Sequence, residues 1–336
     1  MPVNPVTIKD IAKLLGMSKS TVSRALKDHP DISAETKEAV VFLAAKLHYY
    51  PNEVAVSLRH KKSRIIGLIV PQISFFFFPS VIRGVEEVAS KHGYKLMILQ
   101  SDERIDREID ACNIMMSGNV EGMLASVSLT SSNFDHFRQM VHLGLPVVFF
   151  DRVPEEFEAD KVLLDDRDGA RRAVEYLIST GRHKIAICLG SANLLISKNR
   201  LKGYEDAFLD AGLCMDESWI IRGDTMEEIE LVTTELLSRK QIPDGILAIS
   251  DLTMSGIMKS IYKLKLKVPD DIAVIGFCEE PFSTMYNPPV TAIKPMGFEI
   301  GQNAAELLFK RITEKGTYLP PVRIDLPGEL IVREST

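Results

Sequence analysis

Several features that mark other classes of protein are missing from this sequence of 336 residues. The longest apolar stretches, such as residues 65–70, are strand-sized and fall well short of the ~18 residues that span a bilayer. The four cysteines, Cys112, Cys188, Cys214 and Cys278, include no C-x-x-C spacing, and the seven histidines form no H-x-x-x-H pair. We therefore expect free thiols, no metal site, no disulfide framework and no membrane partner.

Export and catalytic signatures are missing as well. The N-terminus, residues 1–4, leads straight into a polar helical pattern, without the charged start and apolar core of a secretion signal. The sequence contains no G-x-G-x-x-G at a strand–helix turn, no P-loop, no G-x-S-x-G and no H-E-x-x-H motif. We expect a cytoplasmic protein that is not an enzyme and uses no cofactor, although a catalytic triad scattered along the chain leaves no such signature.

What is present is a soluble composition, with 46% apolar and 26% charged residues, on a length that predicts two or three domains. The net charge of −6 is unevenly distributed. Residues 1–64 hold eleven Lys and Arg against six Asp and Glu, a net charge of +5, which leaves −11 for the remainder. A small basic head on a large acidic body indicates a polyanionic partner for the head alone.

Three short helical patterns fill the first fifty residues. Thr7 is a candidate N-cap of the first, whose apolar residues recur with helical spacing until Gly16. Ser18 is the N-cap of a second helix, predicted over residues 19–26, and Ser33 is the N-cap of a third. Two short helices joined by a turn that contains glycine, with a third packed across them, form a helix-turn-helix unit.

The second predicted helix carries side chains that fit a DNA groove. Its outward residues are short hydrogen-bonding groups or cations, and none is acidic: Lys19, Ser20, Thr21, Ser23 and Arg24. Such side chains near a helix N-terminus can reach base edges and phosphates in the major groove. The alternative is an ordinary solvated helix face. In the second helix of this unit, within a basic segment, we favour contact with DNA.

A short segment that begins at Tyr50 follows the head. Pro51 ends the preceding helix, and Asn52 can cap a new one that runs through Arg59, with Leu58 on its apolar side. This segment is too short to be a stable helix alone. Two interpretations stay open: a basic linker, or a helix that folds only on DNA and inserts Leu58 into the minor groove.

From residue 64 onward, short apolar runs alternate with amphipathic helical stretches. The first series has predicted strands at 65–70, 95–100, 122–127 and 146–150, and helices at 79–92, 107–117 and 134–143. The second has strands at 162–164, 184–189, 245–249 and 272–276, and helices at 169–180, 200–211, 226–239 and 253–266. Strands buried on both faces that alternate with helices indicate doubly wound parallel sheets. Two such series predict two lobes, with a ligand pocket in the cleft between them.

Together these residues resemble the lactose-repressor/galactose-repressor family of bacterial regulators over almost the whole chain. Residues 7–12 and 18–26 look very close to the family's DNA-binding signature, and residues 48–52 and 57–58 look like its hinge. Further matches in the body are Ile66-Gly67-Leu68, Asp151-Arg152, Asp165-Asp166, Gly169-Ala170, residues 200–203, Ser250-Asp251, residues 271–276 and residues 289–291. These motifs, in order and at family-like spacing, are a far stronger signal than the helix-turn-helix alone.

The resemblance implies an all-α helix-turn-helix head with a hinge helix, and a two-lobed α/β body similar to periplasmic binding proteins. We expect the DNA-binding domain over residues 1–50, the hinge over 51–62, and an effector-binding and dimerisation domain over 63–336. Within that domain, the N-lobe is expected over about 63–162 and 293–323, and the C-lobe over about 163–292 and 324–336.

The resemblance also implies function: a homodimeric transcription regulator, most simply a repressor, that binds a palindromic operator and a sugar-like effector. Its DNA-binding positions match Thr7, Ser18, Lys19, Ser20, Thr21, Ser23, Arg24, Asn52, Leu58 and Arg59. Its effector-binding positions match Phe77, Phe78, Asp151, Arg152, Arg200, Asp251 and Cys278. Closure of the lobes around the effector would be transmitted to the hinge, which couples the two affinities.

The chain departs from the family pattern in three places. Val56 stands where the hinge commonly carries a basic residue, which removes one expected phosphate contact. Asp166 stands where an asparagine is often found. Cys278 stands where the effector loop usually offers an aspartate, and a thiol is a poor partner for a sugar hydroxyl.

Alternatives stay open for the cleft residues and for the function. Phe75 and Phe76 suit a core as well as a pocket, Arg200 suits an ion pair with an acidic neighbour, and the motif that contains Asp251 suits a helix cap. The rival function is a solute receptor of a transporter, which the body alone would suit. The basic head and the missing export signal argue against it.

Overall fold

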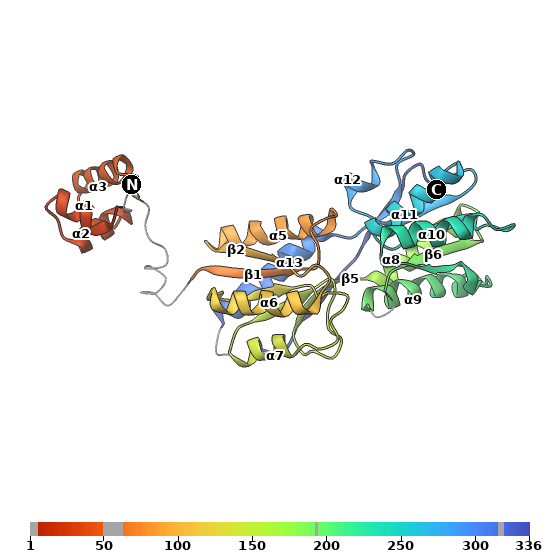
Figure 1. Ribbon diagram of the computed structural model, residues 1–336, viewed down its shortest axis with the longest axis horizontal. Helices are drawn as coiled ribbons and strands as arrows, with labels where there is room; N and C mark the ends of the chain where they lie inside the picture. Colours follow the sequence, from red (N-terminus) through yellow and green to blue (C-terminus); the bar gives the residue numbers. More distant parts are fainter. Residues whose placement is uncertain (1–5, 50–62, 192–193, 315–318) are drawn as a thin grey trace. The chain divides into compact units, whose positions relative to one another are not determined.

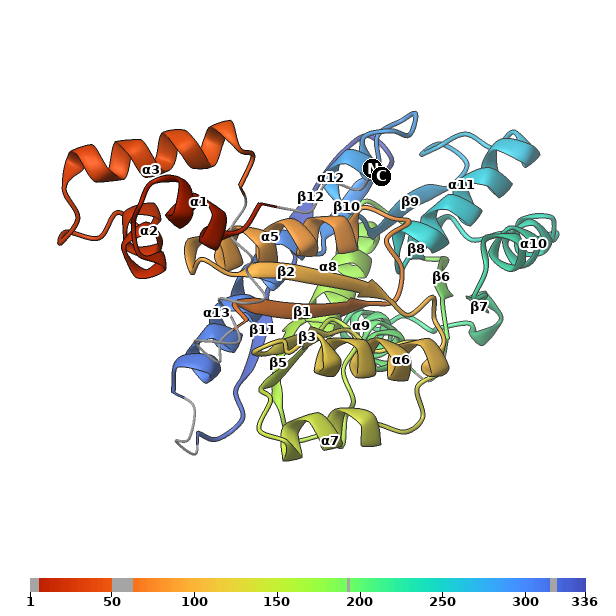
Figure 2. The same ribbon diagram turned by 60° about the vertical axis from the view of Figure 1, so that its left-hand side comes forward.

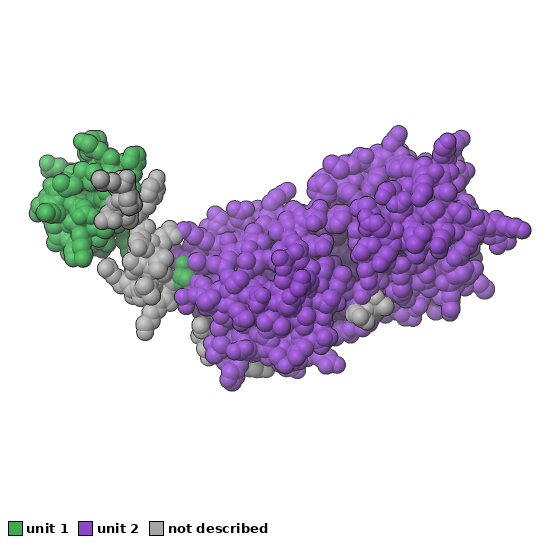
Figure 3. All heavy atoms as spheres, viewed as in Figure 1, with its two compact units in different colours: residues 1–63 green, residues 64–336 purple. Residues whose placement is uncertain are grey.

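The structure, a computed structural model, describes residues 6–49, 63–191, 194–314 and 319–336. The chain divides into two compact units, Met1–Ser63 and Arg64–Thr336 (Figure 3). The described part of the first unit is helical, and the second holds two sheets with helices on both faces. The predicted helix-turn-helix head and two-lobed α/β body are confirmed. The predicted hinge helix, with Asn52, Leu58 and Arg59, lies outside the described residues.

The smaller unit is built from α1 (Ile8–Leu14), α2 (Lys19–Leu26) and α3 (Ala34–Lys46). One buried residue from each helix, Ile11, Val22 and Val40, forms the centre of its core, and all three are fully shielded from solvent. The apolar stripes predicted from the sequence therefore meet in one small cluster, which fixes the orientation of α2 relative to its two neighbours.

Local hydrogen bonds set the ends of these helices. The Ser18 hydroxyl accepts the Thr21 amide at 3.1 Å, and the Ser33 hydroxyl accepts the Thr36 amide at 3.3 Å. Gly16 has a φ of 64°, a left-handed conformation that glycine adopts at little cost. The turn before α2 is thus determined by residues within it, which is why its start at residue 19 could be predicted.

The N-lobe of the larger unit is a six-stranded sheet of order β11-β5-β4-β3-β1-β2, with every neighbouring pair parallel. Its strands are β1 (Ile65–Val70), β2 (Lys95–Gln100), β3 (Met123–Ala125), β4 (Val147–Phe150), β5 (Asp160–Leu164) and β11 (Arg323–Leu326). Helices α5 (Phe77–Lys91) and α13 (Gly297–Thr313) cover one face, and α6 (Ile105–Ser117) and α7 (Asp135–His142) cover the other (Figure 1).

The C-lobe is a second six-stranded sheet, of order β12-β10-β9-β8-β6-β7. Its strands are β6 (Ile185–Leu189), β7 (Ile220–Arg222), β8 (Gly245–Ala248), β9 (Ala273–Phe277), β10 (Thr291–Lys294) and β12 (Glu329–Ile331). Helices α8 (Asp166–Ser179) and α9 (Leu195–Asp210) cover one face, and α10 (Met226–Leu237) and α11 (Asp251–Leu264) cover the other (Figure 2). Two short helices, η1 (Glu217–Trp219) and α12 (Glu280–Ser283), lie in its loops.

The chain passes between the lobes after β5, after β10 and after β11. The strands before the three crossings stay hydrogen-bonded to their own sheets until residues 164, 294 and 326, close to the boundaries expected at about 162, 292 and 323. The sheets are also not wholly parallel, since β12 pairs antiparallel with β10. An antiparallel edge strand of this kind is common on otherwise parallel sheets.

Close helix packing in the N-lobe depends on two glycines. A Cβ atom added to Gly84 of α5 would lie 2.1 Å from the Phe298 carbonyl oxygen, and one added to Gly301 of α13 would lie 2.2 Å from that of Val81. The backbones of the two helices therefore approach each other where side chains are absent. This packing fixes the start of α5, which carries two of the predicted effector residues.

Two absences concern the described residues. In that part of the chain, no helix combines the length and the apolar character that a membrane crossing requires. The same residues contain no group of three or more His, Cys, Asp or Glu side chains placed to hold a metal ion.

Candidate functional site

Six of the predicted DNA-contacting residues lie on or just before α2, and Thr7 is the N-cap of α1. Lys19, Ser20 and Arg24 are exposed, whereas Thr21 and Ser23 are half-buried. The first turn of α2 contains no acidic residue. The free amide groups at a helix N-terminus attract anions, and a nearby carboxylate would compete for them. This end of α2 is therefore suited to a phosphate or a base edge.

Several hydroxyls in this region are already engaged within the head. The Ser18 hydroxyl lies 2.7 Å from that of Ser20 and 2.8 Å from that of Thr21. The Thr7 hydroxyl donates to the Asp10 carboxylate at 2.7 Å, as part of the cap of α1. The cationic side chains of α2 are thus freer to contact a partner than Ser18 or Thr7, whose DNA contacts remain predictions.

A cavity of about 200 Å³ lies between the two lobes of the larger unit, and we call it the cleft cavity. The carboxyl ends of β1, β4, β6, β7 and β8 all lead into loops that line it, as expected for doubly wound sheets. Its lining includes Phe77, Phe78, Asp151, Arg152, Arg200 and Asp251, so six predicted effector residues from both lobes meet here. Cys278 does not line the cavity.

The aromatic wall of the cleft cavity comes from the loop after β1 and the first turn of α5. Phe77 and Phe78 pack edge to face, with ring centroids 5.1 Å apart. Phe75 also lines the cavity. Phe76 does not: it is exposed and packs against Phe282 of α12 at 5.9 Å. Of the four phenylalanines, three therefore offer an apolar surface to a ligand.

Arg200 is held by partners inside the protein. Its guanidinium contacts the Asp166 carboxylate at 2.6 and 2.8 Å, donates to the carbonyl oxygen of Ile249, and lies 3.7 Å from the centre of the Phe277 ring. Burial acts to raise the pKa of Asp166, and these contacts with a permanently charged guanidinium act to lower it. Arg200 therefore forms an ion pair with an acidic residue, Asp166, which is one of the two interpretations of this arginine.

Arg152 is paired in a similar way. Its Nη1 atom lies 2.8 Å from both carboxylate oxygens of Glu103, from the loop after β2. Its neighbour Asp151 adopts a φ of 58° and accepts a long hydrogen bond from Ser126 at 3.4 Å. Burial raises the pKa of Asp151 to about 6, although Arg152 acts in the opposite direction.

Asp251 is a buried polar residue of the cleft cavity whose hydrogen bonds are incomplete. The Ser250 hydroxyl caps α11 by accepting the Thr253 amide at 3.2 Å, so the cap does not use the Asp251 carboxylate. Asp251 is only 6% exposed, and its Oδ1 atom has no hydrogen-bond partner. Burial raises its pKa to about 7, although the Cys278 thiol donates a hydrogen bond to it. Cys278 therefore lies behind Asp251, as a support of the carboxylate.

Several further residues that were not predicted from the sequence line the cleft cavity, among them Ser197, Glu103 and Asp224. Ser197, in the first turn of α9, is 2% exposed and its hydroxyl has no partner. Glu103 and Asp224 follow the ends of β2 and β7. The position of Glu103 just after a predicted strand was a usable signal. Asp224 follows a three-residue strand without any periodicity, so no such signal preceded it.

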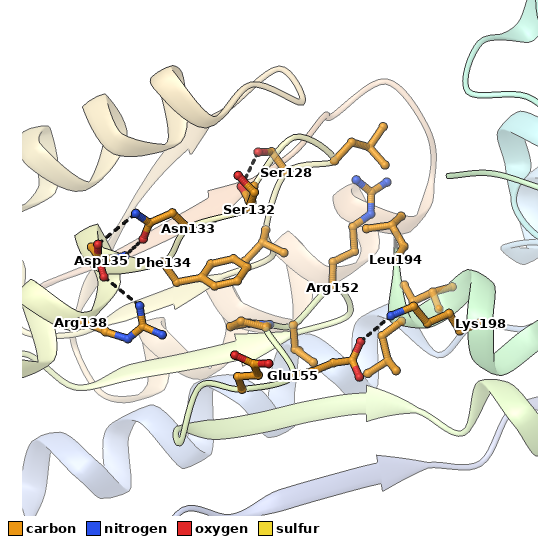
Figure 4. Close-up of a pocket in the computed structure, with 18 residues that line it drawn as sticks. Ser128, Ser132, Asn133, Phe134, Asp135, Arg138, Arg152, Glu155, Leu194 and Lys198 are labelled. Atoms are coloured by element: carbon orange, nitrogen blue, oxygen red, sulfur yellow. Dashed lines mark hydrogen bonds and ion pairs between the residues drawn. The ribbon is translucent and has the colours of Figure 1, made fainter. Parts of the chain in front are cut away.

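Figure 4 shows a second hollow of about 820 Å³, which we call the outer cavity. It shares Leu129, Arg152, Leu194 and Ile196 with the lining of the cleft cavity. Its other charged side chains are mostly paired with each other, Arg138 with Asp135 at 2.8 Å and Lys198 with Glu155 at 2.9 Å. Among the described residues, no buried polar atom without a partner lines it. The smaller cleft cavity is therefore the better candidate for a specific ligand.

Comparison with known proteins identifies both units. Residues 7–52 match the family described as bacterial regulatory proteins, lacI family. Residues 63–329 match the family described as periplasmic binding proteins and sugar binding domain of LacI family. Together the two matches cover the helix-turn-helix head and both lobes.

Relatives and solved structures agree with these matches. The ribose operon repressor of Halalkalibacterium halodurans is 33% identical over 331 residues, 98% of this chain and 97% of that one. The transcriptional repressor PurR of Vibrio campbellii is 31% identical over 312 residues, 92% of each chain. The complex of the transcriptional regulator CelR with cellobiose has a TM-score of 0.74 at 28% identity, and the alignment covers 98% of this chain and 100% of that one.

The Lac repressor bound to ONPG in its repressed state shares the fold, with a TM-score of 0.86 at 24% identity over 99% of this chain and 100% of that one. The resemblance seen in the sequence is confirmed, and the chain carries the DNA-binding domain of a transcription regulator. The chain belongs to the LacI family of bacterial regulatory proteins.

Proposed function

We propose that this protein is a cytoplasmic repressor that binds a palindromic operator as a homodimer and is controlled by a small polyhydroxylated effector in the cleft cavity. The observation that carries the proposal is the pair of unsatisfied atoms there, Asp251 Oδ1 and Ser197 Oγ. Buried polar atoms without partners are rare in folded proteins and each is costly. A ligand with several hydroxyls supplies the missing hydrogen bonds.

The size and walls of the cleft cavity support a sugar-like molecule. At about 200 Å³ it is smaller than the roughly 300–1,000 Å³ typical of sites for drug-sized ligands, which favours a molecule of monosaccharide size. Phe77 and Phe78 offer an apolar face to a ring, while carboxylates on the opposite lobe can accept hydrogen bonds from hydroxyl groups. The ligand would thus contact both lobes at once.

The head supplies the DNA contacts in this proposal. Lys19 and Arg24 approach phosphates, Ser20, Thr21 and Ser23 approach base edges, and the hinge with Asn52, Leu58 and Arg59 contacts the minor groove. A two-fold dimer suits a palindrome because both share one symmetry axis. If the effector favours one arrangement of the lobes and DNA favours one arrangement of the hinges, the two affinities are coupled, typically by ~1–3 kcal/mol.

The experiment measures binding of the full-length protein to its own upstream DNA by fluorescence anisotropy, against a random duplex, with and without monosaccharides. We expect a preference for the upstream duplex that at least one sugar alters. Lys19→Ala should weaken binding, and Lys13→Ala, an exposed lysine of α1, serves as the matched control. A protein that binds both duplexes equally under all conditions would contradict the proposal and favour the rival solute receptor.

The proposal assigns no catalysis to the cleft cavity. After prolonged incubation with the protein, a bound sugar should be recovered chemically unchanged. Chromatographic detection of a product that depends on Asp251 would instead assign an enzymatic reaction to this site.

A further inference from the structure

The charges of the cleft cavity are strongly unequal. Its lining contains four carboxylates, Glu103, Asp151, Asp224 and Asp251, but only two cationic groups, Arg152 and Arg200. No lysine or histidine is found among the described residues that line it. Even before any pairing is considered, an anionic ligand would enter a cavity that already carries excess negative charge.

Both cationic groups are already paired with carboxylates of the protein itself. Arg152 is bound to Glu103, and Arg200 is bound to Asp166, which lies behind the wall and does not line the cavity. The carboxyl groups of Asp151, Asp224 and Asp251 form no salt bridge within the described part of the chain, so none of the three has a cationic group in direct contact.

Asp251 is the most deeply buried of these three residues. It is almost fully buried, and the atom that lacks a hydrogen bond belongs to its carboxylate. A buried charge without a counter-charge is far more costly than a buried neutral group without a hydrogen bond. Without a counter-charge, a buried carboxyl favours its neutral, protonated form. A ligand hydroxyl would supply only a hydrogen bond, whereas an ammonium group would supply both a hydrogen bond and the counter-charge of the ionised carboxylate.

We propose that the effector is a polyhydroxylated molecule that carries a protonated amine, of the amino-sugar class, and that its ammonium group pairs with Asp251. This inference rests on the proposed function and specifies the ligand for the same cavity. The three donors of an ammonium group can serve more than one acceptor. A phosphorylated sugar is disfavoured because both arginines that could bind it are already paired with carboxylates.

Matched ligands that differ in one group test the proposal. Calorimetry and thermal shift on the full-length protein would compare glucose, glucosamine, N-acetylglucosamine and glucose 6-phosphate, and the corresponding galactose and mannose series. In at least one series we expect the amine to bind about tenfold more tightly, or better, than its neutral and phosphorylated counterparts, which corresponds to ~1.4 kcal/mol. The N-acetyl sugar keeps the nitrogen but removes its charge.

A pair of variants separates the role of Asp251 from general electrostatics. Asp251→Asn should abolish the preference for the amine, whereas Asp210→Asn, at the exposed end of α9, removes the same charge away from the cavity and should preserve it. Circular dichroism and operator affinity without ligand would show that Asp251→Asn is folded.

Each outcome is decisive. Preference for a neutral sugar or a sugar phosphate would overturn the amine proposal and leave the proposed function standing, provided that this ligand alters operator binding. Equal affinities, or an amine preference that Asp251→Asn retains, would also overturn it. If no member of the three series binds, the amine proposal fails, and the DNA titration alone then decides the proposed function.

Discussion

Replacing Asp251 with asparagine should alter the pH dependence of folding in a direction that the structure fixes. Burial raises the folded-state pKa of this carboxyl to about 7, against about 3.9 for an unfolded aspartate. Between these two values the folded protein holds a proton that the unfolded chain releases. The contribution of Asp251 to stability is therefore greatest at acidic pH and is lost progressively as the pH rises from about 4 to about 7.

The magnitude follows from the difference between the two pKa values. A difference of about 3, at ~1.36 kcal/mol for each pKa unit, corresponds to ~4 kcal/mol. The difference in free energy of unfolding, Asp251→Asn minus wild type, should therefore increase by roughly this amount from about pH 4 to about pH 7. Above pH 7 the difference should stay constant. Urea titrations without ligand, followed by the fluorescence of Trp219, report on the lobe that contains Asp251, because Trp219 is the single tryptophan of the chain.

The comparison with wild type is necessary because burial also raises the pKa of other groups, including Asp151 and Glu279, which contribute in the same direction. Asp210→Asn is again the control, because Asp210 is exposed and does not line the cleft cavity. If the difference in free energy of unfolding between Asp251→Asn and wild type stayed constant, or fell as the pH rose, Asp251 would have a counter-charge that the structure does not show. An ammonium group would then have no uncompensated carboxylate to pair with at Asp251.

Three further predictions concern DNA binding and packing. The logarithm of operator affinity should fall linearly with the logarithm of salt concentration as Lys19 and Arg24 displace counterions; a flat dependence in an anisotropy titration would contradict phosphate contact. Leu58→Ala should weaken operator binding much more than binding to random DNA, and equal losses would remove its role as a wedge. Gly203→Ala would place a Cβ atom 2.1 Å from the Arg167 carbonyl oxygen, so it should destabilise the body by ~1–3 kcal/mol in urea titrations, and an unchanged midpoint would show that α8 and α9 separate easily.

The head was predictable because the interactions that shape it are local. The second helix was predicted over residues 19–26 and is observed over Lys19–Leu26. Its start is set by the Ser18 hydroxyl, three residues from the amide that it caps, and its approach is set by Gly16. Neither feature depends on the rest of the chain, so the sequence contains all that is needed.

The last fifty residues were not assigned any helix or strand, for two different reasons. Helix α13 carries a clear signal, since Ile300, Ala304, Leu307 and Leu308 recur at helical spacing and are buried, so it could have been found. The strands β11 and β12 could not. Both strands are short and lack a continuous apolar run. β11 forms by pairing with β5, which is distant in the sequence, and β12 forms by pairing antiparallel with β10.

The cleft cavity shows the same division at the level of side chains. The residues after the carboxyl ends of parallel strands lie in one cleft, so the gathering of Asp151 and Asp251 follows from strand order. Strand order does not determine which carboxylate forms an ion pair with each arginine. Glu103 reaches Arg152 across 49 positions and Asp166 reaches Arg200 across 34, and only the packed structure brings these atoms within hydrogen-bond distance.

Those two ion pairs determine how an effector could act. A ligand shifts an equilibrium between two lobe arrangements only if it binds one of them more tightly, and a ligand with equal affinity for both shifts nothing. Because each arginine is already neutralised within the protein, differential affinity must come from the remaining groups, with Phe77 on the N-lobe and Asp251 on the C-lobe. A molecule that satisfies Asp251 but is too small to touch Phe77 should therefore bind without altering operator affinity, whereas one that bridges both should do so.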